Sequence, residues 1–151
     1  MKGGSGQLLV LDTPVIVHLM RNKTTGQAIE AQYSLSAGPE KPLFSSVVQG
    51  EILGLARLWQ WGGKKTSELR ALLGQLVRVD AGLPEVVEAY AELYCEATHS
   101  GRPRGENDLW IAGTARATGA ALVTCDADFA WLHPEYLTVH LVPETGQALG
   151  P

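Results

Sequence analysis

The chain has 151 residues, of which 45% are hydrophobic and 19% are charged. This length suits one domain with a substantial core and is short for two, and the composition excludes overall disorder. The formal net charge of −4 argues against a protein that coats nucleic acid through a broad basic face, although it leaves room for a local site. We expect residues 1–151 to form a single domain, with residues 1–7 flexible.

The apolar segments are too short for a membrane helix, which needs about 18 apolar residues. The apolar run before Asp12 also lacks the length of a secretory signal, so a cytoplasmic protein is expected. Cys95 and Cys125 have no C-x-x-C spacing and are predicted to be reduced core thiols. The four histidines are scattered and form no H-E-x-x-H pair, so a zinc site is not expected.

Short apolar runs alternate with segments of helical periodicity along the chain. The apolar runs predict strands at 7–12, 42–46, 76–82, 120–125 and 137–143. Helical spacing predicts helices at 14–22, 28–38, 47–63, 64–76, 83–101, 106–119 and 126–132. This alternation predicts an α/β fold, with a mostly parallel sheet of four to five strands flanked by helices on both faces.

Local signals predict several helix ends. Thr13 is expected to cap the first helix, because Pro14 suits a first helical turn. The second helix is expected to end at Gly38, which precedes a proline. The pair Gly62–Gly63 is expected to close the third helix.

Two aspartates directly follow predicted buried strands. Asp12 ends the first strand and Asp126 follows the strand at 120–125. Ligands of open parallel sheets bind beyond the carboxyl ends of the strands, so chemistry is expected at these positions. Taken alone, each aspartate is also explained as a turn or helix-cap residue.

Two further carboxylates border apolar helix faces. Glu51 lies at the edge of an apolar stripe, and Asp108 shares a helix face with Ile111. A carboxylate that faces a core is costly unless a positive group neutralises it. Asp108 alone is explained as a first-turn residue with Asn107 as the cap. Four such carboxylates in one domain favour a shared cation, and oxygen ligands suit Mg²⁺ or Mn²⁺.

The carboxylates lie in four motifs. In chain order these are L-x-x-L-D-T, S-V-V-Q-G-E-I-L, G-E-N-D-L-W-I-A-G-T-A and L-V-T-C-D-A-D-F. Their order resembles the PIN domain family and, within it, the VapC-like toxin ribonucleases of type II toxin–antitoxin systems. The resemblance extends from Leu8 to Pro143, and the third and fourth motifs are its most specific part.

The resemblance implies a metal-dependent endoribonuclease that hydrolyses RNA phosphodiester bonds, leaving a 5′-phosphate and a 3′-hydroxyl. Asp12, Glu51 and Asp108 match the family's acidic positions, which are both catalytic and metal-binding. Asp126 matches the fourth position, with Asp128 as its neighbour or substitute. The implied cofactor is Mg²⁺ or Mn²⁺, as one ion or two.

Thr13, Asn107 and Thr124 are expected to support the acidic residues through hydrogen bonds. One position departs from the family pattern, which usually has asparagine or serine two residues after the first aspartate. This chain has Pro14 there. Loss of that polar group is expected to weaken metal binding, while Thr13 remains available to hydrogen-bond in the site.

Four basic residues are candidates for contacts with RNA phosphates. Arg102 and Arg104 lie just before Asp108, whereas Lys64 and Lys65 follow the helix of Glu51. The arginine pair is better placed, because it leads directly into the acidic site. A solvated loop side chain is the alternative explanation for each of these charges.

The helix that carries Glu51 ends in an unusually aromatic segment, which contains Leu58, Trp59 and Trp61. These side chains are expected to form core or homodimer contacts, or a groove for a helix of a cognate antitoxin. The resemblance implies both a homodimer and an antitoxin that blocks the acidic cleft.

Three other functions are open to this sequence. The first is RNA processing by the same chemistry outside a toxin–antitoxin system. The second is a PIN-like domain that binds RNA or protein without cutting, for which Pro14 is the only indication. The third is a phosphatase of the haloacid-dehalogenase type, which is disfavoured because Pro14 occupies the position of its acid aspartate.

Overall fold

The computed structural model describes residues 7–102 and 105–144. The segment 1–7, which was expected to be flexible, falls outside this part of the chain except for Gln7. In the described ranges, no helix combines the length and the apolar character needed to cross a membrane.

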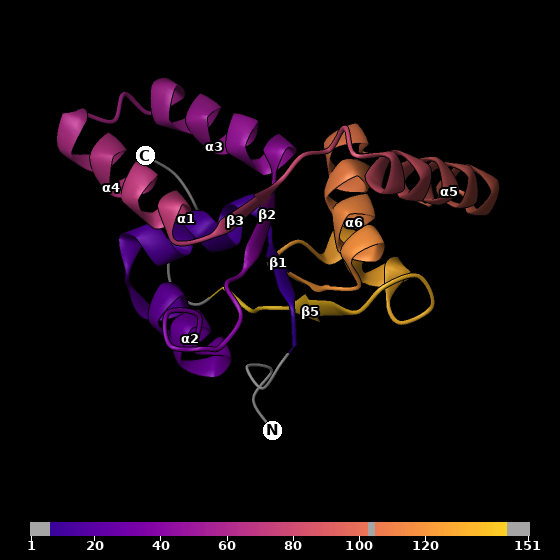
Figure 1. Cartoon of the computed structure of the whole chain (residues 1–151), viewed down its shortest axis with the longest axis horizontal. Helices are drawn as coiled ribbons and strands as arrows, with labels where there is room; N and C mark the ends of the chain where they lie inside the picture. The colour runs from indigo at the N-terminus through magenta and orange to yellow at the C-terminus, as the bar shows by residue number, and fades with distance from the viewer. Residues whose placement is uncertain (1–6, 103–104, 145–151) are drawn as a thin grey trace.

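Five parallel strands form one sheet in the order β3-β2-β1-β4-β5 (Figure 1). They are β1 (Leu9–Leu11), β2 (Leu43–Ser45), β3 (Val77–Val79), β4 (Ala121–Thr124) and β5 (Val139–Leu141). The predicted parallel α/β sheet is confirmed. β1 is central and pairs with β4 in register, with Leu11 opposite Val123, so the two strands end at the same edge.

The strands alternate with helices as predicted. The helices are α1 (Thr13–Arg21), α2 (Thr24–Tyr33), α3 (Ser46–Leu58), α4 (Gly63–Gly74), α5 (Pro84–Ser100), α6 (Glu106–Thr118) and the 3₁₀ helix η1 (Ala127–Leu132). α6 packs against β1, β2 and β4, and α5 packs against α6. Figure 1 shows α5 and α6 on one side of the strands and the pair α1 and α2 on the other.

The core lies around the two central strands. Val10, Leu11, Leu122 and Val123 are completely buried, which explains why β1 and β4 are continuous apolar runs rather than alternating ones. The helices α1 and α2 approach closely at Gly26, where an added Cβ would lie 2.1 Å from the carbonyl oxygen of His18. Any side chain at this position would therefore push the two helices apart.

The start of α1 differs from the prediction. Asp12, not Thr13, is the cap, and its Oδ1 accepts a hydrogen bond of 2.8 Å from the backbone N–H of Thr13. Pro14 lies in the first turn, as expected. Asp12 is still extended at the end of β1, so the helix begins one residue earlier than its proline suggested.

Two helix ends also differ from the prediction. α2 begins at Thr24 and not at residue 28, because Thr25 and Gly26 are buried against α1. It ends at Tyr33 and not at Gly38, and its C-cap residue Ser34 has a positive φ of 51°. α3 ends at Leu58, and Gln60, with a φ of 55°, turns the chain before the glycine pair.

One cysteine prediction is wrong. Cys95 is exposed, because α5 turns a stripe that includes Val86, Leu93 and Ala97 toward the core and carries Cys95 on another face. Cys125 is half-buried beside the core.

Candidate functional site

The carboxyl edge of the sheet brings together the acidic residues that the sequence singled out. Asp12 follows β1, and its N–H bonds the carbonyl of Val123 in β4 at 3.0 Å. Asp126 stands two residues beyond the end of β4. Glu51 comes from α3, which begins directly after β2, and Asp108 comes from the first turn of α6.

Asp12 is the most buried of these carboxylates, with an exposed fraction of 4%. Besides the Thr13 N–H, it accepts a hydrogen bond of 2.7 Å from the Thr124 hydroxyl to Oδ2. The Thr124 oxygen in turn accepts the Asp126 N–H at 3.0 Å. Thr124 thus fixes the side chain of the first aspartate and the backbone of the fourth.

Both carboxylate oxygens of Glu51 accept hydrogen bonds. The Thr13 hydroxyl donates to Oε1 at 2.7 Å, and the Asn107 amide donates to Oε2 at 3.0 Å. Asn107 is therefore not the cap of α6; that position is held by Gly105, which has no side chain to accept a bond. All three residues predicted to support the carboxylates make hydrogen bonds to them.

The carboxylates are close enough to shift one another's protonation. The pKa of Asp12 is raised to about 6, mainly by burial, although the Thr124 and Thr13 hydrogen bonds oppose the shift. The negative charges of Asp108 and Glu51 raise the pKa of Asp12 further. Because opposing hydrogen bonds do not cancel the rise, holding this group ionised at neutral pH is costly.

Asp108 behaves in the same way. Its pKa is raised to about 6 by burial and then by the negative charges of Asp126, Glu51 and Asp128, in that order. Asp126 is half-buried and its Oδ1 accepts the Asp128 N–H at 2.8 Å, whereas Asp128 is exposed. The stronger effect of Asp126 on Asp108 makes it the better candidate for the fourth acidic position.

The chemistry of this cluster fits a hard divalent cation. In the described part of the chain, no lysine or arginine forms an ion pair with any of these carboxylates. The donors are all oxygens, the ligands that Mg²⁺ and Mn²⁺ prefer. No three of the carboxylates bring ligand atoms within 4.8 Å of one another.

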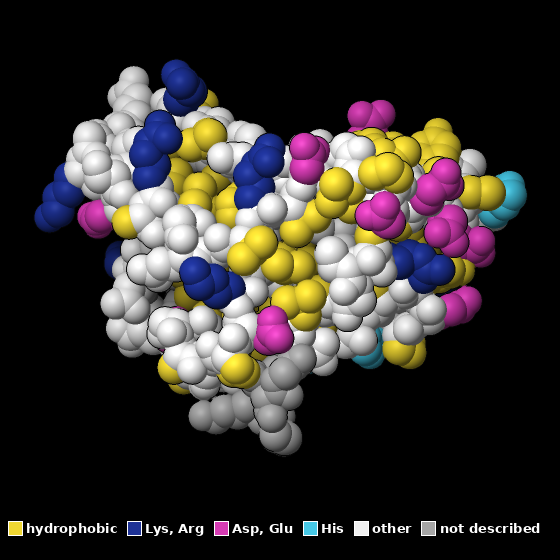
Figure 2. Space-filling model, in the orientation of Figure 1, with side chains coloured by type: hydrophobic (Ala, Val, Ile, Leu, Met, Phe, Trp, Pro, Cys, Tyr) yellow, Lys and Arg dark blue, Asp and Glu magenta, His cyan; other side chains and the backbone are white. Residues whose placement is uncertain are grey.

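The predicted RNA-binding residues lie outside the cluster. Lys64 and Lys65 are in the first turn of α4, and the Lys65 ammonium lies 4.4 Å from the centre of the Trp61 ring. Arg102 is exposed just after α5, and Arg104 falls outside the described residues. Figure 2 shows Lys and Arg side chains gathered over the α3 and α4 side of the molecule and Asp and Glu side chains over the α5 side.

The predicted aromatic segment forms part of this same basic side. Trp59 and Trp61 pack against the core, with ring centres 6.0 Å apart, whereas Leu58 is 73% exposed. Beside them, a hollow of about 510 Å³ is lined by Leu53, Ala56, Arg57, Gln60, Trp61, Thr66 and Arg70. An apolar floor with a basic rim suits an amphipathic, acidic segment.

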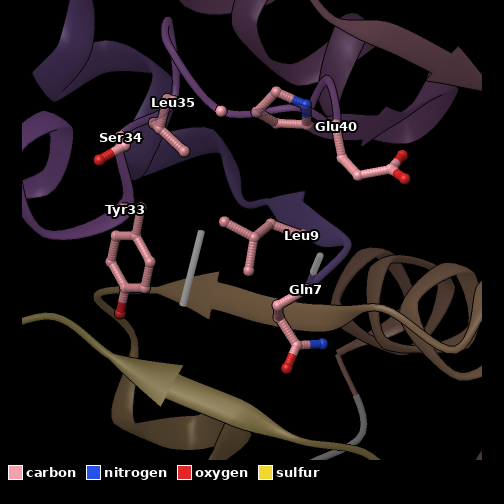
Figure 3. A pocket seen from close by; sticks show the side chains of 8 residues that line it. Gln7, Leu9, Tyr33, Ser34, Leu35 and Glu40 are labelled. Atoms are coloured by element: carbon pink, nitrogen blue, oxygen red, sulfur yellow. The ribbon is translucent and has the colours of Figure 1, made fainter. Parts of the chain in front are cut away.

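A different hollow lies near the start of β1 (Figure 3). It is lined in part by Gln7, Leu9, Tyr33 and Leu35. Its volume of about 10 Å³ is what one water molecule needs. It is too small for a substrate and lies away from the edge that carries the carboxylates.

The parallel α/β fold described above is that of a PIN domain. The family model described as PIN domain matches residues 9–132, and the chain belongs to this family. Nuclease activity is the general function of PIN domains, which generally use divalent metal ions. No curated protein sequence matches the chain.

Solved structures of similar fold include chains from toxin–antitoxin systems of bacteria. One is a chain of VapBC2 from Rickettsia felis, in a crystal structure with a DNA fragment from the VapBC2 promoter. It is 24% identical to this chain with a TM-score of 0.76, and the match covers 89% of this chain and 98% of the other. VapBC-5 from Mycobacterium tuberculosis, a member of the VapBC family of toxin-antitoxin systems, is 23% identical with a TM-score of 0.63, covering 91% and 99%. FitAcB from Neisseria gonorrhoeae is 25% identical with a TM-score of 0.64, covering 87% and 96%.

Proposed function

We propose that this protein is an endoribonuclease that hydrolyses RNA phosphodiester bonds with Mg²⁺ or Mn²⁺, and that it acts in the cytoplasm as the toxin of a toxin–antitoxin pair. The main support is that the negative charge of Asp108 raises the pKa of Asp12, although the two residues come from opposite halves of the chain, and that neither has a basic partner among the described residues. A divalent cation would neutralise this cluster.

Asp12, Glu51, Asp108 and Asp126 would hold the cation. When bound, such a cation lowers the pKa of a coordinated water and stabilises the charge that develops on the phosphate. The protein's part is to fix the ligands: Thr124 holds the Asp12 carboxylate, and Thr13 holds that of Glu51. Asn107 holds the second oxygen of Glu51, so this carboxylate has little freedom to turn away.

The basic residues outside the cluster would bind the RNA backbone. Arg102 and Arg104 precede α6, whose first turn carries Asp108, and would contact phosphates next to the scissile bond. Lys64 and Lys65 would contact RNA phosphates farther from the scissile bond, with Lys65 held over the Trp61 ring. Such contacts carry no base specificity, which in single-stranded RNA comes from stacking and from contacts to base edges.

The toxin role is supported by similarity to the VapBC complexes and by the apolar surface around Leu58. A cognate antitoxin segment with apolar and acidic side chains would fit the hollow beside Trp61, with Arg57 and Arg70 at its rim. A homodimer is part of the same proposal. The alternatives are RNA processing by the same chemistry and RNA or protein binding without cleavage.

The proposed chemistry is tested with purified protein and a structured RNA. Cleavage is expected with Mn²⁺ or Mg²⁺, with 5′-phosphate ends, and is expected to stop when a chelator removes the metal. Cleavage that persists in the chelator would contradict the metal mechanism. Binding of RNA without cleavage at any metal concentration would favour the non-cleaving alternative.

The proposed biological role is tested separately in cells. Induced expression is expected to arrest bacterial growth, and co-expression of a small neighbouring reading frame is expected to restore it. An active nuclease that does not affect growth would instead favour RNA processing.

Thr13 is expected to act through Glu51. Replacement of Thr13 by alanine removes the hydroxyl that donates to Oε1 at 2.7 Å, and should weaken metal affinity and cleavage about 10- to 100-fold. The conservative Thr13→Ser keeps the hydroxyl and should stay near the wild-type value. Calorimetric titration with Mn²⁺ measures the difference, and equal affinities for the alanine and serine variants would exclude this role.

A further inference from the structure

A second group of metal-ligating side chains lies next to the acidic cluster but is not part of it. His18 comes from α1, Cys125 from the turn between β4 and η1, and Glu144 from the segment after β5. One ligand atom from each lies within 4.8 Å of the other two, and no other trio in the described ranges meets this condition. The spacing along the chain does not indicate this group, because the three residues come from distant segments.

The three side chains would need to move only slightly to bind one ion. The side chain of His18 is 7% exposed and its Nε2 lies 2.6 Å from Oε2 of Glu144. In a tetrahedral zinc site with bonds of about 2.0–2.3 Å, ligand atoms stand roughly 3.3–3.7 Å apart. The His18–Glu144 pair would therefore open by about 1 Å. Glu144 is exposed, so its carboxylate is free to make this adjustment.

His18 has less freedom to adjust, because its side chain is buried and its backbone packs tightly against α2 at Gly26. Cys125 is also anchored, since Thr124 before it bonds Asp12 and Asp126 after it bonds Thr124. Two ligands are thus fixed by the fold, and the third is adjustable. A site with this character closes on a cation by moving one exposed side chain.

The donor set differs from that of the acidic cluster. Imidazole and thiolate ligands select borderline cations such as Zn²⁺ and Co²⁺, whereas carboxylates alone select Mg²⁺ or Mn²⁺. Neighbouring residues, Cys125 and Asp126, would therefore serve two chemically different sites. The simpler alternative is that the His18–Glu144 pair holds the segment after β5 without any ion.

We propose that His18, Cys125 and Glu144 bind Zn²⁺, with water as the fourth ligand, and that this ion ties the segment after β5 to α1 and to the turn that carries Asp126. Zinc bound here stabilises the protein by fastening three segments that are distant in sequence. The site does not depend on the nuclease activity proposed above.

Co²⁺ tests this assignment, because a cobalt–thiolate bond produces a charge-transfer band in the near ultraviolet and tetrahedral Co²⁺ absorbs strongly in the visible. Full-length protein is titrated with Co²⁺ under reducing conditions, with excess Mg²⁺ present to occupy the acidic cluster. One equivalent of Co²⁺ is expected to produce both signals, and Zn²⁺ is expected to abolish them.

Variants identify the ligands. Cys125→Ser is expected to remove the charge-transfer band, and Glu144→Gln to weaken Co²⁺ binding at least about tenfold, a loss within the range of outer-shell changes at metal sites. Cys95→Ser is the matched control, because the Cys95 thiol also has an imidazole neighbour: its Sγ lies 3.8 Å from Nδ1 of His99. It should keep both signals, as should Asp108→Asn, which separates this site from the acidic cluster.

The proposal is overturned if the wild-type protein produces no thiolate band, or if the band survives in Cys125→Ser. It is also overturned if Cys95→Ser abolishes the band. Circular dichroism shows that each variant is folded, and the exposed Glu144→Gln serves as a second variant if Cys125→Ser does not fold. If the wild-type protein lacks the band, the His18–Glu144 pair holds the segment after β5 against α1 without any metal ion.

Discussion

Replacement of Asp108 by asparagine is expected to lower RNA cleavage roughly 100- to 1,000-fold, the loss typical when one group that stabilises transition-state charge is removed. The same change is expected to stabilise the metal-free protein. Burial, and then the negative charges of neighbouring carboxylates, raise the pKa of Asp108 to about 6, so a neutral amide relieves a desolvation and repulsion cost that the cation would otherwise relieve. Activity and stability should therefore change in opposite directions.

Asp80→Asn is the matched control for this experiment. Asp80 follows β3 at the same edge of the sheet, but it is exposed and its carboxylate accepts a hydrogen bond from its own turn, the Gly82 N–H at 2.7 Å. It should leave cleavage unchanged. Cleavage rates at saturating Mn²⁺, together with urea denaturation in a chelator, measure both effects. An Asp108→Asn protein as active as wild type would remove Asp108 from the mechanism.

The metal-free protein is expected to become less stable as pH rises from 4 to 7, the reverse of the usual behaviour of carboxylates. In the folded chain, the pKa of Asp12 is raised from 3.8 to about 6. Between these values the folded state binds more protons than the unfolded state, so the free energy of unfolding falls with rising pH. The loss from Asp12 alone is on the order of 2–3 kcal/mol at pH 7.

Denaturant midpoints at pH 5 and pH 7 in a chelator measure this dependence, and Asp12→Asn isolates it. The comparison with Asp12→Asn is needed because a second group also makes stability depend on pH: burial and the neighbouring His133 lower the pKa of His140. That shift acts in the opposite direction, since the unfolded state then binds more protons and stability rises with pH. The difference between wild type and Asp12→Asn should fall as pH decreases toward 4. A pH-independent difference would contradict the raised pKa of Asp12.

The sequence predicts the sheet well because its strands are short apolar runs. β1 and β4 are buried on both faces, so their apolar character is continuous and needs no tertiary information to find. Helix ends are less predictable where packing decides them. α3 ends at Leu58, and Trp59 and Trp61 after it pack on the core, whereas the glycine pair predicted to close α3 instead begins α4.

The same distinction applies to the sites. Asp12 and Asp126 are predictable from their place after buried strands, and Asp108 from its apolar helix face. The bond from Thr13 to Glu51 joins residues that are 38 positions apart, and the one from Asn107 to Glu51 joins residues 56 apart. No local pattern reports such pairs, and none reports the group around His18, because only the folded chain brings these side chains together.

The strand order has a consequence for synthesis of the protein. β1 is made first, yet its partner β4 is made more than 100 residues later, after β2 and β3 are available on the other side. A nascent chain that has not reached Thr124 lacks both the hydroxyl that holds Asp12 and the fourth carboxylate. On the function proposed above, a fragment that ends before this point is therefore expected not to cleave the RNA around it.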